Sequence, residues 1–286
     1  MAGSAPQARS WLLLEHPGPW PVDAVAGSGI EPAVLQTLRD AAEGAGARIL
    51  LVRRPGRPAP DAARSWIVAR PGRTTVSGPW REDADLRAAA VALGTAPAAA
   101  DDPVGVGDAL ILVCAHGVHD ACCAIRGRPV AAALIEDFPG QVWECSHVGG
   151  DRFAPNVVVL PDGFYYGNLD PDSAVRTVRQ HLSGVVDATA LRGMANVPPP
   201  VQAAVAAAYE RLGPLAPGAV SAEHVHQVGP HDGHGSETTV VLRVAAVGQV
   251  RVEVLAVRRP VAQLTCRAPR ETPATEYQVV SFAELT

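Results

Sequence analysis

Several features are scarce or missing in this sequence of 286 residues, and each absence excludes a class of protein. The formal net charge is -5 at pH 7, so the chain lacks the positive excess that attracts nucleic acid or an anionic membrane surface. No apolar run approaches the roughly 18 residues that a membrane-spanning helix needs. The N-terminus has no basic start followed by an apolar stretch, so no secretory signal is predicted. We therefore expect a protein without nucleic-acid or membrane partners.

Cysteine is also scarce, and its distribution along the chain is uneven. There are 5 cysteines, an odd number, in a chain without a predicted secretory signal, which argues against a secreted disulfide framework. Four of them lie in two short segments, each directly after or at the end of a predicted strand, and the fifth is Cys266. Thiols that stay reduced are free to bind metal, so we expect a cytoplasmic protein.

Apolar periodicity predicts a mixed α/β fold in which helices pack on small mixed sheets. The predicted order is strand, helix, three strands and helix, and this order occurs twice. Two thioredoxin-like β-α-β-β-β-α units in tandem would give such a pattern, and two unrelated α/β modules are the alternative. The expected strands are 11–14, 48–52, 66–69, 74–77, 109–113, 142–144, 157–160 and 164–166, and the expected helices are 32–43, 82–93, 129–137 and 172–182.

The chain divides into three predicted regions. Residues 1–100 form a first unit without a cluster, 101–190 form the unit that carries the cluster site, and 191–286 form an accessory α+β region. An alanine-, proline- and aspartate-rich stretch at 95–103 marks the first boundary, and a proline-rich stretch at 194–200 marks the second. The accessory region is expected to contain a helix at 201–212, a hairpin of 238–244 and 251–257, and a strand at 276–280.

The two cysteine segments carry residues that bind soft metals. The first runs from Cys114 to Cys123, and the second runs from Cys145 to Asp151. Thiolates and imidazoles collected at strand ends indicate a metal or iron–sulfur cluster site. The spacing matches neither the ligand pairs of a zinc knuckle nor the cysteine runs of common ferredoxins. A thioredoxin active site is disfavoured too, because Cys122 and Cys123 are adjacent and are expected near the end of a loop.

Several spaced motifs carry a family resemblance. They are Cys114-x8-Cys123, then Ser146-His147-x-Gly149-Gly150-x-Arg152-Phe153-Ala154, then a strand with a Tyr-Gly turn, and near the N-terminus Trp11-Leu12-Leu13-Leu14-Glu15-His16-Pro17-Gly18-Pro19-Trp20. Together they resemble the sucrase/ferredoxin-like family from about residue 11 to residue 185. The resemblance implies a thioredoxin-like ferredoxin that carries one [2Fe–2S] cluster and moves single electrons. Its partners would be redox proteins, either a reductase or an electron acceptor.

The resemblance also implies the ligands of the cluster. The family's pattern is two cysteines in the first loop and His-x3-His in the second, which Cys114, Cys123 and His147 match. Asp151 stands where the second histidine would be, so the fourth ligand is open. Cys145 is the preferred candidate because iron in such clusters favours thiolate. Asp151 keeps the family's position but offers a harder oxygen.

Other residues of these ligand types are expected to be structural. Cys122 is a third candidate for the fourth ligand, but adjacent cysteines rarely face one small cluster, so a packed thiol is expected. Cys266 is expected in the core, and His116 and His119 are expected to make hydrogen bonds within the first loop. A further group is expected to lie in a solvated loop, with a metal site as the alternative: His224, His226, His231 and His234.

The function that these patterns favour is electron transfer rather than stand-alone catalysis. No pair of carboxylates suggests a glycosidase acid and nucleophile, so the word sucrase finds no support. One alternative is a cluster-free, thioredoxin-like thiol oxidoreductase that uses Cys122 or Cys123. Another is a binding protein stabilised by zinc. Three arginines near the expected ligands could offset the charge of the cluster or form a docking patch: Arg126, Arg128 and Arg152.

Overall fold

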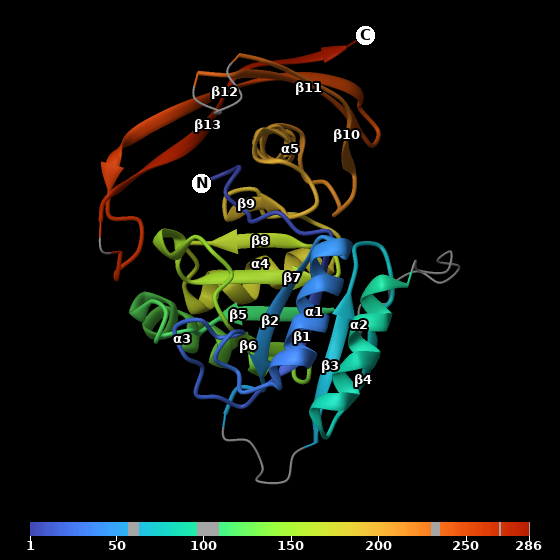
Figure 1. The fold of residues 1–286 in the computed structure, drawn as a ribbon. Coiled ribbons are helices and arrows are strands. Elements are labelled where there is room, and N and C mark those ends of the chain that lie inside the picture. The colour runs from blue at the N-terminus through green and yellow to red at the C-terminus, as the bar shows by residue number, and fades with distance from the viewer. Residues whose placement is uncertain (57–62, 96–108, 230–234, 269, 286) are drawn as a thin grey trace.

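The structure is a computed structural model that describes residues 1–56, 63–95, 109–229, 235–268 and 270–285. Its described part contains a mixed sheet of nine strands, a separate antiparallel sheet of four strands and five α-helices (Figure 1). The predicted mixed α/β class is confirmed. Most of the expected boundary, 96–103, lies outside the described residues. No described helix combines the length and the apolarity needed to cross a membrane.

The first half of the large sheet is formed by residues 10–94. Its elements are β1 (Ser10–Glu15), α1 (Pro32–Ala45), β2 (Ala47–Arg53), β3 (Arg64–Ala69), β4 (Val76–Trp80) and α2 (Leu86–Gly94). The strand order is β4-β3-β1-β2, with β1 parallel to β2 and antiparallel to β3. Leu12 and Leu14 of β1 pack in the cluster beneath α1 and α2, and Leu13 faces the other way, because side chains alternate along a strand.

The second half repeats this connectivity. Its elements are β5 (Leu110–Cys114), α3 (Ala121–Asp137), β6 (Val142–Cys145), β7 (Asn156–Leu160), β8 (Phe164–Gly167) and α4 (Pro171–Leu182). The order is β6-β5-β7-β8, in which β5 is parallel to β6 and antiparallel to β7. The strand β9 (Leu191–Met194) adds to the free edge of β8. The two halves therefore share one strand order, and the likeness of each to thioredoxin stays a prediction.

The two halves meet face to face. They join through β2 and β6, which pair in register only at Val52 with Cys145 and at Arg53 with Glu144. In a flat sheet β1 and β8 would be separated by four other strands, yet Nε1 of Trp11 donates to the hydroxyl of Tyr165 at 3.5 Å. Their helix-free faces share one apolar cluster, and in Figure 1 the strands of the second half lie across those of the first.

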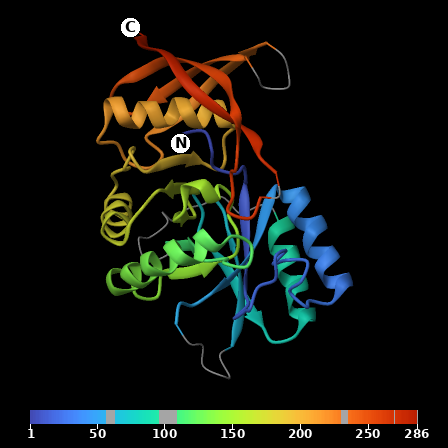
Figure 2. The same cartoon turned by 90° about the vertical axis from the view of Figure 1, so that its left-hand side faces the viewer.

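The C-terminal region consists of α5 (Pro199–Leu212), β10 (Val220–Val228), β11 (Glu237–Val244), β12 (Gly248–Ala262) and β13 (Thr272–Leu285). The four strands pair in sequence order and arch over α5 (Figures 1 and 2). Apolar side chains of α5 and of this sheet join the core that underlies α3 and α4. β12 and β13 extend beyond the sheet, and the loop that joins them reaches back toward α3.

The start of α3 corrects one prediction. The helix was expected at 129–137, with Pro129 in its first turn, but it begins at Ala121 and contains Pro129 in its interior. The actual start signal is Asp120, whose side chain caps the helix by accepting from the backbone N–H of Cys122 at 3.1 Å. Cys122 and Cys123 therefore lie in the first turn of a helix rather than in a loop.

Three smaller differences have local causes. α4 was expected from residue 172 with Asp172 or Ser173 as its N-cap, but it begins at Pro171 and is capped by Asp170, whose carboxylate accepts from the backbone N–H of Ser173. β9 was not predicted, because Arg192 interrupts its apolar pattern. β10 was not predicted either, because all but the first of its residues are exposed.

Candidate functional site

The first cysteine segment turns back on itself at the end of β5. Cys114 is the last residue of that strand and is buried. The chain then reverses, and Asp120 caps α3, so that Cys123 in the first helical turn lies over the strand end. Gly127 makes this close approach possible, because a Cβ there would lie 2.2 Å from the carbonyl oxygen of Cys114. The fold thereby brings the two cysteines of the Cys-x8-Cys motif together.

The second segment makes an equally sharp turn after β6. The two residues Gly149–Gly150 have φ angles of 84° and 78°, a left-handed backbone that favours glycine. A short 3-10 turn over Asp151–Phe153 follows. This reversal carries Asp151 back alongside His147, four residues earlier in the chain. A Cβ at Gly150 would lie 2.2 Å from Nη2 of Arg192, so the loop also needs glycine to pack on that side chain.

The two segments converge on one buried site. The potential ligand atoms of Cys114, Cys123 and His147 lie within 4.8 Å of one another, and those of His119, His147 and Asp151 form a second such set. Asp151 bridges the two sets, because its Oδ1 is 3.3 Å from Sγ of Cys123 and 2.9 Å from Nδ1 of His147. Two thiols, an imidazole and a carboxylate are thus collected at the ends of β5 and β6. Such a set of donors suits iron or zinc.

His147 and Asp151 are close without being aligned as a hydrogen bond. Although Nδ1 and Oδ1 are 2.9 Å apart, neither Nδ1 of His147 nor Oδ2 of Asp151 has a hydrogen-bond partner within the described part of the chain. Buried polar atoms normally have such partners. A cation between the two segments would satisfy both atoms, so the residues present fit a metal or an iron–sulfur cluster.

The charges of this site favour a thiolate at Cys114. A hydrogen bond from Cys123 lowers the pKa of Cys114 against the effect of burial, and His147 and the backbone N–H of His116 lower it further. The same contact with Cys114, together with burial, raises the pKa of Cys123. Burial lowers the pKa of His147, but Asp151 and Cys114 outweigh burial and raise that pKa to about 9. These shifts favour an imidazolium at His147 beside a thiolate at Cys114.

His116 and His119 anchor the first loop to the other half of the protein. Nε2 of His116 donates to the carbonyl of Pro21 at 2.8 Å, and its Nδ1 accepts from the backbone N–H of His147 at 3.3 Å. Nδ1 of His119 donates to the carbonyl of Val22 at 3.1 Å. The expected hydrogen bonds therefore exist but leave the loop: those to Pro21 and Val22 cross between the two halves, and the one from His147 joins the two cysteine segments.

His119 also orients His147. Their rings stack with centroids 3.9 Å apart and planes 24° apart. Nearly parallel rings direct their in-plane lone pairs side by side, so the two histidines do not converge on a single ion. His119 is thus better suited to hold the ring of His147 than to bind metal itself.

Cys145, the preferred fourth ligand of the sequence prediction, neighbours Cys114 across β5 and β6 but belongs to neither set of donors described above. It is the last residue of β6, so the pleat of the strand directs its side chain into the apolar cluster between the two halves. Within the described residues it belongs to no set of three donors that lie within 4.8 Å of one another. Burial raises the pKa of its thiol. The geometry therefore favours Asp151 over Cys145, and a ligand role for Cys145 stays a prediction.

Cys122 lies beside this site but outside its donor sets, with its Sγ 3.6 Å from the carbonyl oxygen of Asp151. Its Sγ donates to Oδ1 of Asp120 at 3.0 Å, and burial and that carboxylate raise the pKa of the thiol. Cys266 was expected in the core but is exposed, in the loop between β12 and β13. Its backbone N–H donates to Oδ2 of Asp120 at 2.7 Å. Asp120, Cys122 and Cys266 form a third set of donor atoms within 4.8 Å of one another.

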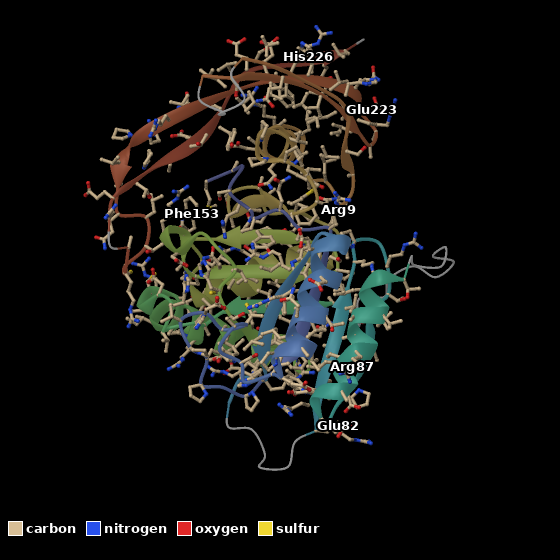
Figure 3. All side chains as sticks on the ribbon, in the orientation of Figure 1. Arg9, Glu82, Arg87, Phe153, Glu223 and His226 are labelled. Carbon is tan, nitrogen blue, oxygen red and sulfur yellow. The ribbon has the colours of Figure 1, made fainter. Side chains whose placement is uncertain are left out.

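Two histidines of the histidine-rich segment, His224 and His226, lie outside the candidate site. His224 and His226 lie in β10, where a solvated loop was expected, and both are exposed. Figure 3 shows His226 on the outer side of the C-terminal sheet, remote from the cysteine segments. Neither residue belongs to a set of candidate ligands within the described ranges. His231 and His234 lie outside the described residues.

Arg192 is a residue of the site that sequence reasoning missed. Its side chain is fully buried in β9, and it donates to the carbonyl of Gly149 at 2.9 Å and to Oδ1 of Asn156 at 2.8 Å. No carboxylate of the described chain forms an ion pair with it. Burial lowers its pKa to about 10, so it is charged at neutral pH. In the sequence, an arginine within a short apolar run could have indicated a buried cation at this position.

Comparisons with known proteins give one family and one partial relative. The model of the sucrase/ferredoxin-like family matches residues 1–193 of the 286. The chain is similar to "Altered inheritance of mitochondria protein 32" of Meyerozyma guilliermondii, with 29% identity over 97 residues. That similarity covers 30% of this chain and 32% of the relative, so it spans about a third of each. No solved structure matches the chain.

Proposed function

The chain belongs to the sucrase/ferredoxin-like family, and from that premise we propose that it is a one-electron carrier with a [2Fe–2S] cluster. The observation that carries the proposal is the convergence of two thiols, an imidazole and a carboxylate at the ends of two neighbouring strands. Cys114, Cys123, His147 and Asp151 would hold the cluster. When bound, such a cluster accepts and returns single electrons without bond making in a substrate.

Asp151 is the fourth ligand in this proposal. Its carboxyl group is almost fully buried, lies within reach of both Cys123 and His147, and keeps one oxygen without a hydrogen bond. Cys145 is the softer donor, but among the described residues its sulfur belongs to no set of three donor atoms that lie within 4.8 Å of one another. Proximity thus outweighs the preference of iron for thiolate. A neutral imidazole in place of one thiolate also lowers the negative charge of the site.

The face beside the site suits a redox partner protein. Arg126 and Arg152 are exposed there and line one cavity with Asp151, whereas Arg128 is exposed two residues further along α3, on the opposite side of the helix from Arg126. Two exposed apolar side chains lie on the same segments, Val118 at 45% and Ile125 at 72%. Arginine and apolar groups together are typical of protein interfaces. A partner with an acidic rim would fit this face, and the unpaired cysteines suit a reducing compartment such as the cytoplasm.

An iron and sulfide assay on anaerobically purified protein tests the proposal. We expect about two irons and two sulfides per chain with a visible charge-transfer spectrum, since these are the contents of one [2Fe–2S] cluster. Cys114→Ser and Cys123→Ser should each lose both, whereas the control Cys266→Ser should retain them. A colourless protein that carries zinc would instead favour a zinc-stabilised binding protein. A metal-free protein that exchanges thiols would favour an oxidoreductase.

Pulsed EPR of the reduced protein tests the histidine separately. A strongly coupled nitrogen is expected from His147, and the signal should persist in His119→Phe, which keeps a stacked ring but no ring nitrogen. Absence of such coupling in a protein with full iron content would remove His147 from the ligand set. Loss of the coupling in His119→Phe alone would assign the nitrogen to His119.

A further inference from the structure

A second pair of cysteines lies just outside the proposed cluster site. The sulfurs of Cys122 and Cys266 are within 4.8 Å of each other, although residues 123–265 separate them in sequence. Cys122 lies in the first turn of α3, and Cys266 lies in the loop between β12 and β13. The two segments come from different regions of the chain, so their meeting is a tertiary contact and not a consequence of sequence proximity.

One buried carboxylate holds both cysteines in place. Oδ1 of Asp120 accepts from the backbone N–H of Cys122 at 3.1 Å, and Oδ2 accepts from the backbone N–H of Cys266 at 2.7 Å. A further contact fastens the same loop, because Nη1 of Arg267 donates to the carbonyl of Val118 at 2.6 Å. The backbones of both cysteines are thus fixed before any bond forms between their sulfurs.

A cavity of about 270 Å³ opens beside this pair. The proposed ligand Asp151 lines it, together with Cys122, Cys266 and two arginines, Arg126 and Arg152. Both sulfurs are therefore reachable from solvent, and the arginines favour a reagent that carries carboxylates. The cavity lies between the β12–β13 loop and the segments that hold the proposed ligands.

From this arrangement we infer that Cys122 and Cys266 form a reversible disulfide that fastens the β12–β13 loop across the site. The oxidant is a small anionic disulfide of the glutathione disulfide class. Exposed Cys266, as the thiolate, attacks one sulfur of the reagent and releases one thiol. Cys122 then attacks the Cys266 sulfur of the mixed disulfide and releases the second thiol. One S–S bond breaks and one forms, and the two cysteines lose two electrons and two protons, which the released thiols carry.

The bond would set access to the proposed cluster. With both thiols reduced, only the hydrogen bonds to Asp120 and Val118 hold the loop, and it can lift from the cavity. With the disulfide formed, the loop is tied covalently to α3, next to the face that carries Arg126 and Arg152. A partner that binds this face would then be blocked by the tethered loop. The bond itself depends only on the pair of cysteines and not on the identity of the cofactor.

Peptide mapping of the full-length protein in glutathione redox buffers tests the inference. As the proportion of glutathione disulfide rises, we expect two thiols per chain to disappear together and one linked peptide pair, Cys122 with Cys266, to form. Cys266→Ser should show neither, and its visible spectrum should equal that of the wild type, because Cys266 is not a proposed ligand. A link between Cys122 and Cys123, a link between two chains, or no link at the oxidising limit would overturn the inference.

Hydrogen exchange tests whether the disulfide restrains the β12–β13 loop or forms without changing its motion. Amides of residues 263–268 should exchange several-fold more slowly in the oxidised wild type than in the reduced protein. In Cys266→Ser the same amides should exchange equally fast in both buffers. Equal exchange in oxidised and reduced wild type would show that the bond does not restrain the loop. If the iron assay finds no cluster, the Cys122–Cys266 link and the slower exchange of the loop are still expected. The proposed cluster and the proposed disulfide can therefore fail separately.

Discussion

Nδ1 of His147 lies 2.9 Å from Oδ1 of Asp151, yet the two groups are not aligned as a hydrogen bond. The pair stands where the family's pattern has His-x3-His, and the Gly149–Gly150 turn brings its members together. Two donors that converge without bonding to each other are arranged for a shared ion. This relationship, more than the count of cysteines, is what favours Asp151 in the proposed ligand set.

A pair of substitutions distinguishes the two candidates for the fourth ligand. Asp151→Ala should lose most of the iron and sulfide, because it removes an oxygen that no other described side chain replaces. Cys145→Ala should retain them, because its thiol lies in the core between the two halves. Iron and sulfide content together with the visible spectrum measure both outcomes. The opposite result would make Cys145 the ligand.

In that experiment, a loss of folding stability must be distinguished from the loss of a cluster ligand. Cys145→Ala leaves a small cavity in a packed core, with an expected cost of about 1 kcal/mol. Its unfolding midpoint in urea should therefore fall even while the cluster stays. Asp151→Ala removes a buried carboxylate that contacts His147 and Cys123, so the midpoint of the metal-free variant should fall as well. Iron and sulfide are therefore compared in buffer without urea, where circular dichroism checks that both variants are folded.

The acidity of the donors predicts how metal binding depends on pH. A metal must displace one proton from Cys123, whose pKa is raised, and one from His147, whose pKa is raised to about 9, whereas the lowered pKa of Cys114 favours its thiolate. The logarithm of the affinity of the metal-free protein for Zn²⁺ should thus rise by about two per pH unit between about pH 7 and pH 9. Above the pKa of His147 the slope should fall to about one.

Competition with a chelator over this pH range measures the slope. His147→Ala should show a slope of about one throughout, because one of the two displaced protons is gone. His226→Ala is the matched control, since that histidine is exposed on β10 and should leave the slope unchanged. If His147→Ala and the wild type show the same slope, the metal does not displace a proton from His147.

Substitution of Gly127 by alanine should destabilise the protein, unlike most glycine-to-alanine changes within a helix. Alanine normally stabilises a helix by about 1 kcal/mol relative to glycine. At Gly44 of α1 no atom lies within 4 Å of the added Cβ, so Gly44→Ala should give up to this gain. At Gly127 the Cβ would lie 2.2 Å from the backbone oxygen of Cys114. We therefore expect Gly127→Ala to destabilise by roughly 1–3 kcal/mol and to lower the iron content. Urea unfolding of both variants measures the difference, and equal gains would contradict the close packing.

Local patterns predicted most of the regular elements. The hairpin of β7 and β8 was expected because Asp162 and Gly163 form a turn between two apolar runs, and α1 was expected from Pro32 and the spacing of its leucines. The start of α3 was missed because a proline inside a helix resembles a proline at its start. The capping role of Asp120 depends on its own backbone conformation, which the spacing of apolar residues does not reveal.

The site was predictable where its members are close in sequence and not where they are distant. Cys114, Cys123 and His147 follow from spaced motifs. The hydrogen bonds of His116 and His119 to Pro21 and Val22 connect segments about a hundred residues apart, and no local pattern encodes them. The direction of Cys145 was also undetermined, because it depends on whether β6 ends before or after that residue.

Arg192 supports a prediction about the reduction potential. It is a buried cation that donates to the carbonyl of Gly149, and attraction to Cys114 and Asp151 partly offsets its loss of hydration. A reduced cluster carries one more negative charge than an oxidised one, so a nearby cation favours reduction. Arg192→Gln should therefore lower the midpoint potential by roughly 30–60 mV, given that about 59 mV corresponds to a tenfold change for one electron.

Arg192→Lys is the matched variant, because it keeps the positive charge and loses most of the hydrogen bonds. If charge determines the potential, the lysine variant should stay close to the wild type while the glutamine variant falls. If Arg192 acts only by holding the Gly149–Gly150 turn, both variants should lose iron together, and any cluster that remains should keep its potential. Redox titration followed by EPR, with iron content measured on the same samples, separates the two roles. An unchanged potential in Arg192→Gln at full iron content would show that this charge is too well screened to act on the cluster.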